Sequence, residues 1–233
     1  MVNVDIRGIG WVTPSGLGSG RPGEVFRLEP GQLPALKSRQ FLDALHPRFG
    51  RFDTYAKAGF GAIALALRSA SLDQWTQKRP VGLVVSTRHG CLEADLAYFA
   101  TAAFQGGALA SPNLFAYTLP GTMLGEASIQ FGLTGPSFVV DNHDGHLAGV
   151  YAALDLMRWG FCETVVAGWC DVDSAVWSNS AEEPCGAVFL VLAKGSDGAS
   201  WQWDGRRLTC GTQRIADLTE LVRKVLIAGH PDT

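Results

Sequence analysis

Short apolar runs, separated by glycine-rich breaks, dominate the hydrophobic pattern of the chain. Residues 2–12, 81–87, 137–141, 164–172 and 186–194 are rich in Val, Ile, Leu and Phe, a composition typical of β-strands. The run at 81–87 is continuous and rich in β-branched residues, as in a strand that is buried on both faces. We therefore expect buried strands at these places, with another beginning at residues 201–203.

Apolar residues recur at helical spacing between these runs. The pattern begins after Asp53 and predicts a helix of several turns, and further helices are predicted over 92–104, 147–159 and 212–228. Residues 115–131 start as a loop and continue as a helix. Strands that alternate with helices predict an α/β fold with a mostly parallel central sheet flanked by helices. We expect one domain over residues 1–200 and a short C-terminal appendage, with an amphipathic helix, over 201–233.

Composition and charge remove several classes of function. The 233 residues carry a net charge of −3, and Lys and Arg are scattered, so no nucleic-acid partner is expected. No apolar run approaches the ~18 residues of a membrane span, and the N-terminus does not read as a signal peptide, so we expect a cytoplasmic protein without a membrane partner. The five cysteines form no C-x-x-C pair, which argues against a zinc site. We expect no metal and no cofactor.

Several short motifs occur in a characteristic order between residues 8 and 192. They read GIGWVTP at 8–14, RFDTYA at 51–56, VGLVV at 81–85, and SP, LPG and FGLTGPSF between Ser111 and Phe138, followed by VVAGW at 165–169 and CGAVFLVL at 185–192. In this order they resemble the N-terminal half of the β-ketoacyl synthase family, which has the thiolase fold. The resemblance implies a thiolase-like N-terminal half, and the amphipathic helix of the appendage would replace the missing second half.

One departure from the family pattern bears directly on activity. In active members a cysteine follows the proline of the GPS motif by eight residues, and here the eighth residue after Pro136 is Asp144. The family's two catalytic histidines lie in its second half, which this chain does not contain. A carboxylate is a weaker nucleophile than a thiolate, and without the imidazoles the developing enolate has no partner. The resemblance therefore predicts that no residue is catalytic and that the chain is a pseudoenzyme.

The polar run around Asp144 permits two interpretations. His143, Asp144 and His146 are types of residue that bind metals or exchange protons, so they could form a metal site or an acid–base pair. Alternatively Asp144 caps the helix predicted at 147–159 by accepting backbone N–H bonds, as Asp often does. We favour the cap.

The resemblance also predicts a partner. Family ketosynthases are dimers in which the strand before the nucleophile pairs with its two-fold mate, which here implicates the partner-strand candidates Ser137, Phe138, Val139, Val140 and Asp141. Chain-length-factor subunits of type II polyketide synthases have lost the nucleophile and close the tunnel of an active ketosynthase. Short members of this kind occur in aryl polyene synthesis. The resemblance implies that the segment 111–124 lies against the partner's pocket. Its bulky residues are our tunnel-gate candidates, namely Phe115, Tyr117, Leu119 and Met123.

The resulting hypothesis is a non-catalytic chain-length-factor-like subunit. It would bind an active β-ketoacyl synthase as a heterodimer or heterotetramer, meet the acyl carrier protein only indirectly, and shape the acyl tunnel in polyene, polyketide or fatty-acid-type synthesis. Two alternatives remain open. One is a divergent thioester hydrolase or acyltransferase that uses Asp144 with His143 or His146, and the other is a module that binds acyl carrier protein.

Overall fold

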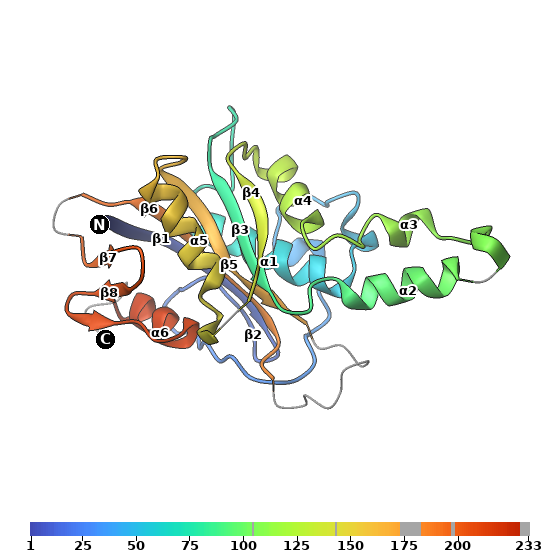
Figure 1. Cartoon of the computed structure of the whole chain (residues 1–233), viewed down its shortest axis with the longest axis horizontal. Coiled ribbons are helices and arrows are strands. Elements are labelled where there is room, and N and C mark those ends of the chain that lie inside the picture. The colour runs from blue at the N-terminus through green and yellow to red at the C-terminus, as the bar shows by residue number, and fades with distance from the viewer. Residues whose placement is uncertain (104, 143, 173–182, 197–198, 229–233) are drawn as a thin grey trace.

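A single mixed sheet forms the centre of the protein (Figure 1). The computed structural model describes residues 1–103, 105–142, 144–172, 183–196 and 199–228. Within these residues the sheet has nine strands in the order β4-β3-β5-β6-β1-β7-β8-β9, and β2 pairs with β1 beside this path. The strands are β1 (Val2–Thr13), β2 (Gly16–Gly18), β3 (Gly82–Thr87), β4 (Ser137–Asp141), β5 (Thr164–Asp171), β6 (Gly186–Lys194), β7 (Trp201–Trp203), β8 (Leu208–Cys210) and β9 (Gln213–Arg214).

The α/β class is confirmed, but the sheet is mixed rather than mostly parallel. β3 pairs in parallel with β4 and β5, whereas β6 pairs antiparallel with both β5 and β1, and β7 pairs antiparallel with β1. The sequence did not distinguish these cases because β5 and β6 are apolar on both faces, and such runs occur wherever helices cover both sides of a sheet.

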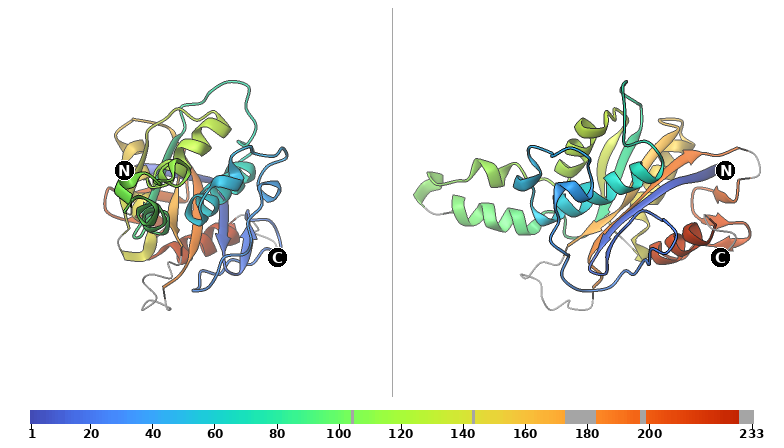
Figure 2. Two further views of the ribbon diagram at one scale, coloured as in Figure 1. Left: turned by 90° about the vertical axis from the view of Figure 1, so that its right-hand side faces the viewer. Right: turned by 180° about the vertical axis from the view of Figure 1, so that it is seen from behind.

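Helices cover both faces of the sheet, α1 on one and α5 on the other (Figures 1 and 2). The helices are α1 (Thr54–Ser69), α2 (Leu92–Ala102), α3 (Pro112–Phe115), α4 (Thr122–Phe131), α5 (Ala148–Arg158) and α6 (Leu218–Ala228). The Asp53 side chain caps α1 by accepting from the Ala56 N–H at 2.9 Å. A Cβ atom on Gly10 of β1 would lie 2.4 Å from the Ala62 carbonyl oxygen, so glycine lets α1 pack directly on the strand.

The C-terminal segment packs on α5 and extends the sheet. The Trp203 ring stacks on Tyr151 of α5 at 4.8 Å, and its indole N–H donates to Asp155 at 2.9 Å. Leu218 and Leu221 of α6 are buried in the same core as α5. The expected amphipathic helix is present, but it begins at Leu218 rather than Thr212, because Gln213–Arg214 pairs with β8.

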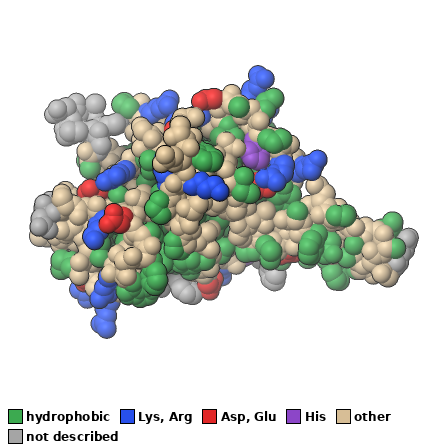
Figure 3. Space-filling model, turned by 90° about the horizontal axis from the view of Figure 1, so that it is seen from above, with side chains coloured by type: hydrophobic (Ala, Val, Ile, Leu, Met, Phe, Trp, Pro, Cys, Tyr) green, Lys and Arg blue, Asp and Glu red, His purple; other side chains and the backbone are tan. Residues whose placement is uncertain are grey.

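A second feature is a projection that leaves the body between β3 and α4 (Figures 1 and 2). We call residues 92–119 the arm; it contains α2 and α3, which contact one another. Glu93 and Asp95 are the sole charged residues in its sequence. Its described exposed apolar side chains are Leu96, Phe99, Leu109, Phe115 and Leu119, and hydrophobic side chains gather along the arm in Figure 3. No helix among the described residues is long and apolar enough to cross a membrane.

Candidate functional site

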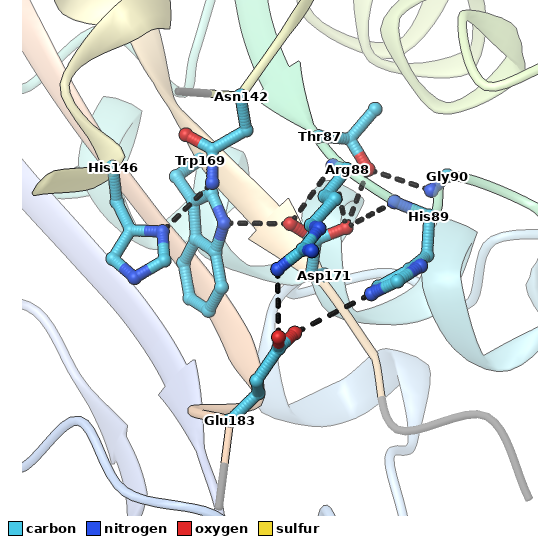
Figure 4. A network of polar contacts seen from close by, with 9 residues as sticks. All are labelled: Thr87, Arg88, His89, Gly90, Asn142, His146, Trp169, Asp171 and Glu183. Carbon is cyan, nitrogen blue, oxygen red and sulfur yellow. Dashed lines mark hydrogen bonds and ion pairs between the residues drawn. The ribbon is translucent and has the colours of Figure 1, made fainter. Parts of the chain in front are cut away.

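The carboxyl ends of the three parallel strands converge on one polar cluster (Figure 4). In strand order these ends are Asp141 of β4, Thr87 of β3 and Asp171 of β5. In open α/β sheets the carboxyl ends of parallel strands are the usual place for ligands and reactive groups. The candidate site therefore lies where the fold would be expected to hold one.

Asp171 is the centre of this cluster. Its side chain is buried, and both of its carboxylate oxygens accept hydrogen bonds. Oδ1 accepts from the Thr87 hydroxyl at 2.7 Å and from the His89 backbone N–H at 2.9 Å, and Oδ2 accepts from the Trp169 indole at 2.7 Å. The Arg88 backbone N–H is shared between both oxygens, at 2.9 and 3.0 Å. Two successive backbone N–H groups thus point at one anion, and that anion is the chain's own carboxylate.

A second layer of charges lies outside Asp171. The Arg88 guanidinium donates to Glu183 at 2.6 Å, and the His89 ring nitrogen Nε2 lies 3.5 Å from the other Glu183 oxygen. Arg88 and Glu183 are exposed, so their ion pair contributes little to stability. The effect of the two contacts is to hold Arg88 and His89 over the carboxyl end of β3.

His146 packs against the other side of the cluster. Its ring lies on Trp169 with the ring centres 4.8 Å apart, and its Nδ1 is 2.8 Å from Nδ2 of Asn142. Burial lowers the pKa of His146, and the nearby Asp171 opposes that shift. The contacts with Asn142 and Trp169 hold the imidazole in place, and its burial favours the neutral form.

The residues at the expected nucleophile position form a tight turn. Asp144–His146 is a single 3₁₀ turn, with φ of 72° at Gly145 and 59° at His146. These left-handed residues delay the helix, so α5 begins at Ala148 and its N-cap residue is Leu147. Asp144 is therefore not the N-cap residue of α5, and capping by its side chain stays a prediction. The Asp144 side chain and all of His143 lie outside the described residues, which contain no cluster of three potential metal ligands.

The structure separates the four gate candidates into two pairs. Phe115 and Leu119 are 61% and 69% exposed on the arm. Tyr117 and Met123 are buried in the protein's own core, and the Met123 sulfur fills the space beside Gly59 of α1. The latter two are corrected: side chains packed inside the chain's own core cannot reach a partner.

The partner-strand candidates form β4, which is the last strand at its end of the sheet (Figure 1). The sequence predicted a buried strand, but Ser137 and Asp141 are exposed, and Phe138, Val139 and Val140 are half-buried. The difference follows from position, because within the described residues β4 pairs with β3 alone.

Sequence reasoning missed the residue at the centre of the cluster. Asp171 ends a strand that was predicted from its apolar run, and an acidic residue that follows buried positions was the available signal. Its partners Thr87 and Arg88 come from a strand 84 and 83 residues earlier. Such pairing depends on strand order, which one sequence does not reveal.

Comparison with known proteins identifies the family. The family model described as "Beta-ketoacyl synthase, N-terminal domain" matches residues 37–179. No curated protein sequence matches the chain. Among solved structures, the ishigamide ketosynthase/chain length factor is similar with a TM-score of 0.66 and 16% identity, over 84% of this chain and 63% of that one.

Two further solved structures that are similar to this chain also contain ketosynthases. One contains the ketosynthase ApeO in complex with its chain length factor ApeC from Xenorhabdus doucetiae, with a TM-score of 0.55, 19% identity and coverage of 84% of this chain and 81% of the other. The other contains a type II acyl carrier protein in complex with its ketosynthase, AntDE:AntF, with a TM-score of 0.60, 17% identity and coverage of 83% and 63%. This chain thus spans less than two thirds of the first structure it matches. The shared architecture confirms the thiolase-like fold, and the chain belongs to the β-ketoacyl synthase family through its N-terminal domain.

Proposed function

We propose that the protein is a non-catalytic chain-length-factor-like subunit that binds an active β-ketoacyl synthase and shapes its acyl tunnel. The observation that carries the proposal is the surface formed by β4 and the arm. Gly121, two residues after the arm, lies beside Val139 of β4, where a Cβ atom would be 3.7 Å from the Val139 side chain. The segment that follows the arm therefore lies beside the edge strand β4.

The ladder between β3 and β4 shows which backbone groups remain available for a partner. Leu83 N–H donates to the Pro136 carbonyl at 2.9 Å, and Asn142 N–H donates to the Thr87 carbonyl at 3.0 Å. In a parallel ladder alternate residues point their N–H groups to the same side. On the β4 side, the groups that bond to β3 belong to the even-numbered Pro136 and Asn142. Val139 is odd-numbered and lies between them, so its N–H points away from β3. A partner strand could add to this edge through main-chain hydrogen bonds.

The arm favours a protein partner over solvent. Exposed apolar side chains on an almost uncharged projection mark an interaction surface. Phe115 and Leu119 are the two gate candidates that such a partner could receive. Chain length factors and ketosynthases occur together in two of the similar structures, which supports a ketosynthase as the partner. Acyl carrier protein would then meet the complex through the ketosynthase.

The polar cluster supports the non-catalytic part of the proposal. Asp144 stands at the position of the nucleophile, and the neighbouring donors of Arg88 and His89 are occupied by Asp171. The His146 ring is held by Trp169 and by a hydrogen bond with the Asn142 amide. We also propose that the chain divides at residue 200 into a domain and a C-terminal appendage. The appendage would cover α5, as the second half does in longer relatives.

Co-expression with a full-length ketosynthase and size-exclusion chromatography test the proposal. Val139→Pro removes an outward-facing N–H while leaving the β3 ladder intact, so it should abolish co-elution. Val139→Ala is the matched control, because it shortens the same side chain and keeps the N–H, and it should co-elute. A stable chain that never co-elutes with a ketosynthase contradicts the proposal. So does thioester hydrolysis by the isolated chain that is lost on Asp144→Ala.

A further inference from the structure

We infer that Tyr98 is a positioning residue that fixes the Phe115 ring and thereby sets the depth of the acyl tunnel in the complex. This inference rests on the proposed function, in which Phe115 is a gate. It adds a determinant of product length from α2, outside the segment that supplies the gate candidates.

The contact that carries the inference lies between the two helices of the arm. The rings of Tyr98 and Phe115 pack at a tilt of 54°, with their centres 5.3 Å apart. Tyr98 is half-buried, whereas Phe115 is 61% exposed. Aromatic pairs at this distance have a preferred geometry, so the more buried ring restricts the orientation of the more exposed one.

Phe115 needs such a support because its own helix is short. α3 spans the four residues Pro112–Phe115, and helices of this length do not hold their form without outside contacts. The Ser111 hydroxyl caps α3 by accepting from Leu114 N–H at 3.3 Å. That cap fixes the start of the helix, whereas Phe115 is its last residue.

A hydrogen-bond relay ties α3 to the turn of α2 that carries Tyr98. The Thr101 hydroxyl donates to the Tyr98 carbonyl at 2.7 Å, and the Ser111 backbone N–H donates to the same hydroxyl at 3.1 Å. One side chain thus joins the backbone of Tyr98 to the cap of α3. The hydrogen bonds of Thr101 and the ring contact together fix the position of Phe115 relative to α2.

The test compares product length in the reconstituted complex of this chain with its ketosynthase, supplied with malonyl-loaded acyl carrier protein. Phe115→Ala should shift the most abundant product, measured by mass spectrometry, to longer chains by at least one extension unit. Tyr98→Ala should shift it in the same direction by less, because the gate ring stays but is no longer held. Tyr98→Phe keeps the supporting ring and should restore the wild-type length.

Two further variants separate positioning from a loss of stability. Tyr151→Ala removes a ring of the same kind from the Trp203 stack on α5, so it should lower the melting temperature and leave product length unchanged. Thr101→Val keeps both rings and breaks the relay, so it should broaden the length distribution even where Tyr98→Ala fails to fold. A shift with Phe115→Ala, together with an unchanged length distribution for both Tyr98→Ala and Thr101→Val, overturns the inference and leaves the gate intact. If the complex forms and Phe115→Ala changes nothing, the proposed gate itself fails.

Discussion

Asp171→Ala should be among the most destabilising single substitutions in this protein. The Asp171 carboxylate is buried and accepts from four donors among the described residues, namely the Thr87 hydroxyl, the Arg88 and His89 backbone N–H groups, and the Trp169 indole. Substitution by alanine removes the carboxylate and leaves these four donors buried around a small cavity that contains no acceptor.

The size of the loss follows from counting the orphaned groups. A buried donor left without a partner costs about 1–3 kcal/mol, and the Thr87 hydroxyl can rotate to find another acceptor. Three fixed donors remain, and entering water will satisfy some of them, so we expect a loss of about 3–5 kcal/mol. Against a typical total of about 5–15 kcal/mol, that loss would leave a marginal fold.

Urea denaturation followed by circular dichroism measures this difference. Asp204→Ala is the control, because Asp204 also accepts two backbone N–H bonds but is exposed, so water replaces its carboxylate with a much smaller loss. Asp171→Asn should fall between wild type and alanine, since its NH₂ group meets the Trp169 indole N–H and its oxygen still accepts from the backbone. A loss below about 1 kcal/mol for Asp171→Ala would refute the reasoning, because it would mean that the bonds are replaced at no cost.

Two other predictions concern the remaining buried polar groups. Burial raises the pKa of Asp53 to about 6, above the value of about 3.9 expected in the unfolded chain, so its contribution to stability is present below pH ~4 and is lost as the pH rises through 6. Asp53→Asn keeps an acceptor for the Ala56 N–H and should raise the free energy of unfolding at pH 7 by about 2–3 kcal/mol. In urea titrations between pH 4 and 6, the decline in the free energy of unfolding that Asp53 causes should disappear. An unchanged slope against pH contradicts this prediction. Trp203→Phe keeps the stack on Tyr151 and removes the bond to Asp155, so it should cost about 1–2 kcal/mol, whereas no loss would show that the bond is unimportant.

β5 and β6 were predictable because both of their faces are buried. Thr164–Asp171 and Gly186–Lys194 are apolar on both faces, so composition alone marks them. Their relative direction was not predictable, because apolar positions are the same in parallel and antiparallel neighbours. The family motifs predicted the thiolase-like fold correctly, yet a mixed sheet required knowledge of which strands are adjacent.

Side-chain exposure was the least predictable property. Phe115 and Tyr117 are aromatic neighbours two residues apart, but Phe115 lies on the surface of the arm and Tyr117 in the core. Met123 reads as a bulky gate candidate, whereas it fills the space above Gly59. The direction of each side chain depends on how the arm leaves the body, and nothing local in the sequence encodes that.

The polar cluster fixes the position of the strands that carry the β4 edge. An anion-binding pair of backbone N–H groups at the end of β3 could serve a ligand only if it were open, and Asp171 closes it from within. The same bonds fix the ends of β3 and β5, and β3 in turn holds β4 in register from Ser137 to Asp141. A rigid edge is what strand addition requires, because a partner must find its bonds already aligned. On our proposal, the carboxyl end of the sheet, which serves chemistry in active relatives, here stabilises an interface. Asp171→Ala should therefore weaken ketosynthase binding although Asp144, at the nucleophile position, is unchanged.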